Sequence, residues 1–244
     1  MRERRAGAVV VLALVVVGVG GWLVVNSPVF SVRHIRVLGN ITLSADEVIS
    51  LAGVSEGENL FRLAPGDMEE ALQRNPWVAE VTVEREWPST LVLHVTERTP
   101  VGWAQGSDGN RVLVAGDGMV LSAVERKPHQ LPSLGSLELS LDPGSLYAGP
   151  RPVLAVAASF AAELRRQVAG IRVGESGVNL RLRVGGTVLY GRASSTDAKN
   201  AALVSILRQV RRDDLRIEYV DVRLPSAPAL KAVAVPTPVP VSTG

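Results

Sequence analysis

The side chains that could carry catalysis or bind a metal are few and far apart in this 244-residue chain. Its three histidines, His34, His94 and His129, have no partner at the spacing that places metal ligands on one helix face, and none belongs to a Ser-His-Asp order. The absence of cysteine excludes thiolate catalysis, disulfides and cysteine-ligated zinc. These residues therefore predict neither a metal site nor a nucleophilic catalytic site.

Two other patterns match catalytic motifs only in part. Ser176, within residues 174–178, lacks the second glycine that a nucleophile turn requires. Glu69 and Glu70 fall on the expected surface of a helix, where paired carboxylates usually serve solvation. Because no phosphate loop or zinc-binding helix is present either, we expect a non-enzymatic protein without catalytic residues, cofactor, metal or small-molecule substrate.

The charge balance argues against nucleic acid as a partner. The chain has 26 Lys and Arg residues against 24 Asp and Glu residues, and residues beyond position 5 carry 23 of each sign. Outside the N-terminus no basic run is longer than the two residues of Arg211-Arg212. Since nucleic-acid binding needs a basic face, no nucleic-acid partner is expected.

Residues 6–25 are uncharged and apolar, and as a helix they would rise about 30 Å, the thickness of a bilayer core. Arginines 2, 4 and 5 precede this segment, so the sequence predicts a short cytoplasmic tail at residues 1–5, one transmembrane helix and an extracytoplasmic remainder. The alternative is a cleaved signal peptide. It is disfavoured because such a peptide has a shorter apolar region, of about 7 to 15 residues, and an Ala-x-Ala-like site.

The rest of the chain predicts two α+β domains and a tail. The signals of the first domain, residues 30–98, are a β-rich segment closed by Gly39-Asn40, the capping-box pair Ser44 and Glu47 with Gly53 at the helix end, a helix from Pro65 to Asn75, and two alternating strands joined by Trp87-Pro88-Ser89. Their order is β-α-α-β-β.

The second domain, residues 99–224, is expected to be a mixed α/β domain with an antiparallel-rich sheet. Its signals are a turn at Asp117-Gly118, a mostly irregular stretch at 127–149, a helical stripe at 153–168, a hairpin at Gly185-Gly186, a helix ending near Arg212 and a last strand at 216–224. In that strand Val220, Val222 and Leu224 are predicted to face the core. Residues 225–244 are rich in proline and are expected to be disordered.

The motifs 57–61, Asn75-Pro76-Trp77-Val78, 83–88 and 97–101, together with this order of elements, resemble the POTRA domain of the FtsQ/DivIB bacterial cell-division proteins. The resemblance covers nearly the whole chain, since those proteins also have one N-terminal span, a second β-rich domain and a disordered tail. It implies a bitopic scaffold in the plasma membrane at the division septum, where the last strand binds FtsB, itself joined to FtsL, by strand addition. It also suggests that POTRA residues 67–75 and the neighbouring strand bind other division proteins.

Carried onto this chain, the resemblance places the partner-binding residues in one strand. They are Glu218, Tyr219, Val220, Asp221, Val222, Arg223 and Leu224. The sequence itself leaves open whether Tyr219 and Arg223 bind a partner or only cover the outer face of the sheet.

Two other functions remain open at this point. One is a POTRA-containing component of protein secretion, although no succession of barrel strands follows the domain. The other is a membrane-anchored exported cell-wall enzyme whose carboxylates no motif marks.

Overall fold

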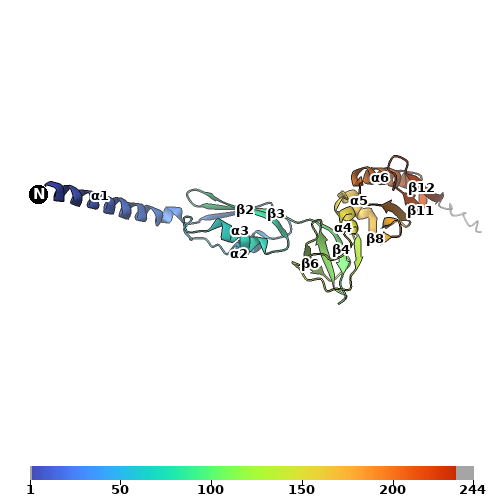
Figure 1. Cartoon of the computed structure of the whole chain (residues 1–244), viewed down its shortest axis with the longest axis horizontal. Helices are drawn as coiled ribbons and strands as arrows, with labels where there is room; N and C mark the ends of the chain where they lie inside the picture. The colour runs from blue at the N-terminus through green and yellow to red at the C-terminus, as the bar shows by residue number, and fades with distance from the viewer. Residues whose placement is uncertain (1, 235–244) are drawn as a thin grey trace, which may run out of the picture. The chain divides into compact units, whose positions relative to one another are not determined.

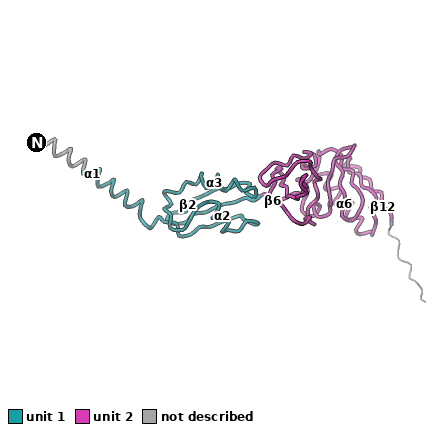
Figure 2. The backbone as a smooth tube through the Cα atoms, turned by 90° about the horizontal axis from the view of Figure 1, so that it is seen from below, with its two compact units in different colours: residues 1–97 teal, residues 98–244 magenta. Residues whose placement is uncertain are grey.

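The computed structural model describes residues 2–234, which form the two compact units coloured separately in Figure 2. The units are Met1–Glu97 and Arg98–Gly244. Figure 1 labels the elements of both. Those of the first unit are α1 (Arg2–Val25), the 3-10 turn η1 (Pro28–Phe30), β1 (His34–Leu38), α2 (Ala45–Ala52), α3 (Pro65–Gln73), β2 (Val78–Glu86) and β3 (Thr90–Glu97).

Helix α1 contains the uncharged segment that was predicted to cross a membrane. Among the described residues, no helix has both the length and the hydropathy of a membrane span.

The first unit has the predicted order β-α-α-β-β after α1. Its three strands lie in the order β1-β3-β2, with β1 parallel and β2 antiparallel to the central β3. Both α2 and α3 cover the same face of this sheet (Figure 1). The core between the two layers is built on fully buried leucines, among them Leu60, Leu72, Leu91 and Leu93.

Local hydrogen bonds fix α2 as the sequence predicted. The Glu47 backbone N–H donates to Ser44 Oγ at 3.2 Å, and the Ser44 N–H donates to Glu47 Oε2 at 2.9 Å. These two bonds form the capping box at the start of the helix. At the other end Gly53 adopts φ = 66°, the left-handed conformation that ends many helices.

A carboxylate at the end of β3 holds the loop that follows β1. The backbone N–H groups of Ile41, Thr42 and Leu43 all donate to the Glu97 carboxylate, at 2.8 to 3.0 Å. Partial burial raises the pKa of Glu97, but these donors outweigh it and leave the pKa below its ordinary value. The loop is therefore held by a charged group more than fifty residues away in sequence.

The Glu97→Gln substitution is expected to lower the free energy of unfolding by about 1 kcal/mol at pH 7, because the loop donors lose their charged acceptor while solvent screens part of the loss. The folded-state pKa lies below the unfolded one. The stabilisation is therefore complete above the ordinary value of 4.5 and is lost as pH falls through the folded-state value. Urea unfolding of both proteins at neutral and acidic pH measures this, with Glu80→Gln on the same sheet as the control. If the free energies of unfolding of wild type and Glu97→Gln differ by the same amount at both pH values, the Glu97 carboxylate does not stabilise the loop by its charge.

The second unit carries the remaining elements. They are β4 (Pro100–Gln105), β5 (Arg111–Ala115), β6 (Val120–Val124), β7 (Ser133–Ser136), α4 (Arg151–Ala158), α5 (Ala162–Gln167), β8 (Val168–Gly174), β9 (Gly177–Leu182), β10 (Thr187–Gly191), α6 (Thr196–Arg212), β11 (Leu215–Asp221) and β12 (Ala229–Ala234). The strands form one mixed sheet in the order β12-β11-β10-β9-β8-β7-β4-β5-β6.

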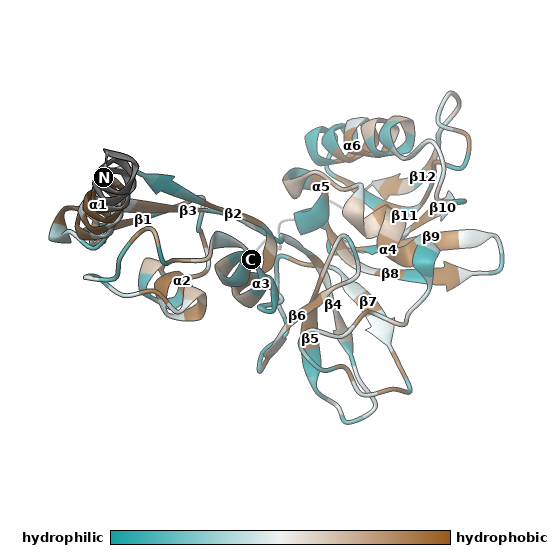
Figure 3. Ribbon diagram, turned by 60° about the vertical axis from the view of Figure 1, so that its left-hand side comes forward, coloured by the Kyte–Doolittle hydropathy of each residue, from teal (hydrophilic) through white to brown (hydrophobic). Residues whose placement is uncertain are grey.

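The core of this unit lies between the sheet and its helices. Buried side chains of α6, such as Leu203 and Leu207, pack in one cluster with Val188 of β10 and Val220 of β11. Figure 3 shows the hydrophobic residues of α6 in brown between hydrophilic residues in teal, as expected for a helix that covers a sheet with one side. The predicted hairpin around Gly185-Gly186 is confirmed as the antiparallel pair β9 and β10.

The stretch 127–149 is mostly irregular, as predicted, and within it Ser133–Ser136 form β7 between β4 and β8. Another expectation for this unit is wrong in part. The helical stripe at 153–168 is interrupted between α4 and α5, and its last residue, Val168, begins β8. Val168 is in a strand because β8 pairs with β9. Hydrogen bonding between the two strands outweighs the helical spacing of apolar residues in the local sequence.

Candidate docking edge of the large sheet

The strand predicted to be terminal has a neighbour on each side. On one side β11 runs parallel to β10, with Tyr219 opposite Thr187. On the other side it runs antiparallel to β12, with Tyr219 opposite Lys231 and Asp221 opposite Ala229. Neither side of β11 is therefore free to receive a further strand.

The expectation of a disordered tail from residue 225 onward is accordingly wrong for Ala229–Ala234. Residues 235–244, which belong to the same prediction, lie outside the described residues. The reason is local. Pro225 and Pro228 occupy the connection between the strands, while the six residues of β12 contain no proline and retain every ladder donor. This proline-free segment was the signal in the sequence, and the proline content of the whole tail obscured it.

The outer boundary of the sheet on this side is β12 itself. It is the first strand in the sheet order, and within residues 2–234 no strand pairs with its far side. An edge strand of this kind presents backbone N–H and C=O groups to solvent, which is the arrangement that accepts an incoming strand.

The predicted partner-binding residues divide into core and surface groups. Val220 and Val222 are fully buried, and the Val222 N–H donates to Leu189 O at 3.1 Å, so both stabilise the unit itself. Glu218, Tyr219 and Arg223 are exposed, and the Tyr219 side chain has 37% of its surface in solvent. This second group, together with Leu224, is accessible to another protein.

Leu224 does not face the core as predicted, because 62% of its surface is exposed. It lies beyond the end of β11, which stops at Asp221, so the alternation of a strand no longer applies to it. A β-bulge between Ile217 and Tyr219 also shifts the alternation, and it brings Ile217 into the core along with Val220.

Two ion pairs lie near this edge of the sheet, and one of them joins β12 to β11. Lys231 Nζ of β12 lies 2.8 Å from Glu218 Oε1 of β11. Arg223 donates to Asp221 with a shortest distance of 2.6 Å, and this hydrogen bond lowers the pKa of the Asp221 carboxyl. Tyr219 therefore stands on a surface with fixed charges on both sides of it.

The second predicted docking surface lies on the first unit, at α3 and β2, and its edge strand is less accessible to strand addition. Strand β2 is an edge strand, but Glu69 of α3 accepts the Val83 backbone N–H at 2.8 Å. A side chain thus occupies a donor that strand addition would need. The exposed part of α3 instead presents the Glu70–Arg74 ion pair to solvent.

The residues considered for chemistry are not brought together. His34 and His94 lie exposed on β1 and β3, and His129 lies in the connection between β6 and β7. His94 Nε2 is 3.8 Å from an exposed carboxylate of Glu84. Among the described residues, no group of three His, Asp or Glu side chains is placed to hold a metal ion.

The class of this protein is defined by its fold, a β-α-α-β-β module followed by a unit built on a mixed sheet. Comparison with protein-family models leads to the same class. The model described as "POTRA domain, FtsQ-type" matches residues 30–98, which makes the part of the first unit that follows α1 a POTRA domain of the FtsQ type. The model described as "Cell division protein FtsQ/DivIB, C-terminal" matches residues 102–223, half of the chain. The chain belongs to the FtsQ/DivIB family of cell division proteins.

Curated relatives support the same assignment. The cell division protein FtsQ of Mycobacteroides abscessus is 32% identical over 227 residues, covering 91% of this chain and 68% of the relative. The FtsQ proteins of Corynebacterium glutamicum and Streptomyces bingchenggensis are each 29% identical, over 207 and 235 residues. These two alignments cover 82% and 93% of this chain and 88% and 86% of the relatives.

Proposed function

We propose that this protein is a non-enzymatic scaffold of the division machinery. It binds FtsB- and FtsL-type partners and so helps to assemble and localise septal peptidoglycan synthesis. Family membership supports a role in cell division. The observation that carries the finer proposal is the edge strand β12, which lies at one end of a nine-stranded sheet with its outer side unpaired among the described residues.

Strand addition is the binding mode that this edge favours. A partner segment would extend the sheet beyond β12 through backbone hydrogen bonds, and its side chains would lie against the exposed outer face. On that face Tyr219 is a large amphipathic group opposite Lys231, and aromatic residues of this kind carry much of the energy of many interfaces. The proposed contact therefore uses the backbone of β12 and the side chains of β11.

The proposed location is the plasma membrane at the septum, with α1 as the single anchor. Residues 6–25 carry no charge, and three arginines precede them, which favours a cytoplasmic N-terminus and places both units on the other side. Binding of other division proteins to the POTRA domain would use the side chains of α3 rather than the backbone of β2, since Glu69 already occupies the Val83 donor.

The Tyr219→Ala substitution is expected to weaken capture of an FtsB-type partner about tenfold, because truncation of a central aromatic contact typically costs more than 1 kcal/mol. The measurement is a titration of the full chain in detergent with the extracytoplasmic part of such a partner.

Leu139→Ala is the matched control for this titration. It also removes an exposed large apolar side chain from the second unit, in the segment after β7 and away from β11 and β12. Equal affinities for wild type and Tyr219→Ala would place the interface elsewhere. An equal loss of affinity in Tyr219→Ala and Leu139→Ala would show that the weaker binding is not specific to the face of β11 and β12.

A further inference from the structure

An aromatic cluster lies at the end of the POTRA domain where α1 joins it. The rings of Phe30, Phe61 and Trp87 contact one another, with centroids 5.0 Å apart for Phe30 and Phe61, 5.8 Å for Phe30 and Trp87, and 4.5 Å for Phe61 and Trp87. Nevertheless, 44% of Phe61 and 49% of Trp87 are exposed. Neighbouring Val29 is also half exposed. These side chains form a contiguous apolar surface. Contiguous surfaces of this kind mark sites of interaction with another protein or a membrane, whereas single exposed apolar residues are common and need no explanation.

Backbone pairing holds the segments that carry Phe30 and Phe61 together. The Leu60 N–H donates to Phe30 O at 2.9 Å, and Ser31 forms a bridge with Asn59. The Phe61 N–H donates to Asn59 Oδ1 at 2.9 Å, which fixes the turn that carries the ring. The three rings therefore form a preformed surface.

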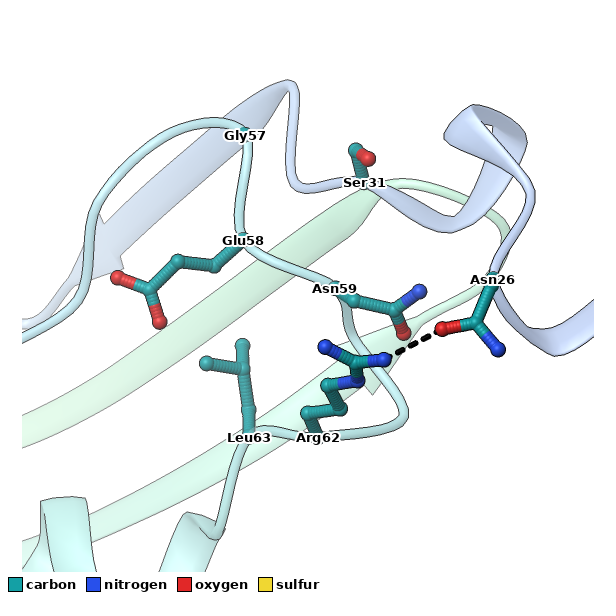
Figure 4. Close-up of a pocket in the computed structure, with 7 residues that line it drawn as sticks. All are labelled: Asn26, Ser31, Gly57, Glu58, Asn59, Arg62 and Leu63. Carbon is teal, nitrogen blue, oxygen red and sulfur yellow. Dashed lines mark hydrogen bonds between the residues drawn. The ribbon is translucent and has the colours of Figure 1, made fainter.

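The same turn also holds the end of α1. Asn59 Nδ2 donates to the carbonyl oxygen of Val25, the last helical residue, at 2.7 Å. Arg62 donates to Asn26 Oδ1, as the dashed line in Figure 4 shows. In the same view the Glu58 carboxylate points away from Arg62, and it accepts the Ser55 N–H instead. The turn that carries Phe61 is thus attached to the helix end.

We propose that this cluster inserts into the interfacial layer of the lipid bilayer beside α1. The inference rests on the proposed anchoring by α1. If residues up to Val25 cross the bilayer core, Phe30 follows only five residues later, through a 3-10 turn that rises about 2 Å per residue. The headgroup layer is of the order of 5 to 8 Å thick on each side. The rings must therefore start within or next to this layer.

The chemistry of the surface fits a bilayer interface. Tryptophan concentrates at the headgroup level, where its ring meets acyl chains and its N–H meets water or carbonyl groups. The guanidinium of Arg62 has five donors, and its contact with Asn26 leaves others for lipid phosphate. Arg62 also lines a polar recess of about 400 Å³ beside the cluster. Insertion would bury the exposed ring area and fix the orientation of the domain on the membrane.

The test uses spin labels on the full chain in phosphatidylcholine nanodiscs that hold one copy each. Because the chain has no cysteine, single labels can be placed without other changes. A label at Ser89→Cys, two residues from Trp87, reports on the cluster while all three rings remain. A label at Ile41→Cys, 90% exposed beyond the other end of β1, serves as the control. We expect the Ser89 label to be several-fold more accessible to oxygen, which dissolves in lipid, than to a water-soluble nickel reagent. We expect the Ile41 label to be more accessible to the nickel reagent than to oxygen.

Replacing both Phe61 and Trp87 by alanine should shift the Ser89 label to water-like accessibility and leave the Ile41 label unchanged. A Ser89 label that is as water-accessible as the Ile41 label in the wild type would overturn the proposal. Protection of Ser89 from both reagents would also overturn it, since a protein surface would then cover the cluster.

A third label at Leu14→Cys, in the middle of α1, separates this inference from the anchoring on which it rests. Lipid accessibility at Leu14 together with water accessibility at Ser89 would refute the inserted cluster alone. Water accessibility at both positions would refute the anchor itself.

Discussion

A proline at one of two adjacent positions in β12 is expected to reduce capture of an FtsB-type partner by about a hundredfold while leaving the stability of the unit nearly unchanged. Backbone N–H groups alternate in direction along an antiparallel edge strand, so of Ala232 and Val233 one donates toward β11 and the other outward. Proline removes the donor in either case. At the outward position only an incoming strand needs that donor.

The second proline of the pair is the internal control. At the inward position it breaks a hydrogen bond between β12 and β11, at a cost of about 1 to 3 kcal/mol, and should lower the melting temperature. Thermal unfolding of Ala232→Pro and Val233→Pro therefore identifies which of the two N–H groups points outward. Capture is then measured by titration with the same partner. Wild-type affinity in the variant with the unchanged melting temperature would exclude addition of a strand to β12.

Substitution of Gly39 is expected to have the largest effect on stability. Gly39→Ala should lower the free energy of unfolding of the POTRA domain by about 3 kcal/mol or more, because two penalties combine. The backbone adopts φ = 84°, which L side chains rarely accept, and a Cβ atom would overlap the carbonyl oxygen of Val95. Val95 lies in the buried central strand β3 and has little room to move.

Gly53→Ala separates the two penalties. Gly53 also has a positive φ, of 66°, but no atom lies within 4 Å of the position where its Cβ would be. Only the conformational cost remains, which is about 1 kcal/mol. Urea unfolding of the full chain, followed by circular dichroism and tryptophan fluorescence, compares the two variants. Similar losses at both positions would show that the contact with Val95 carries no cost.

For the candidate site, the sequence predicted correctly which side chains of β11 point outward, but not which strand forms the edge of the sheet. The outward direction of Tyr219 and Arg223 and the burial of Val220 and Val222 are confirmed. The assignment of this strand as terminal is wrong, since β12 pairs with it. Composition averaged over the tail could not reveal a short strand whose stability depends on a surface formed elsewhere in the chain.

Features whose interactions close within a few residues can be predicted from the amino-acid sequence alone. The capping box of Ser44 and Glu47, the left-handed glycines at positions 39 and 53, and the alternation of Leu91, Leu93 and Val95 all belong to this group. Each depends on a neighbour one turn or one pleat away, so the local pattern specifies it. The order β-α-α-β-β follows from these signals.

Which strands became neighbours depends on long-range contacts that the local sequence does not specify. The parallel pairs β1 with β3 and β10 with β11 join segments separated by helices, and β12 exists because β11 offers it a ladder. The attachment of the Ile41 loop to Glu97 and of the α1 end to Asn59 likewise joins distant residues. Such contacts form only when burial of the two cores has offset the entropy of closing long loops, and no local pattern records that balance.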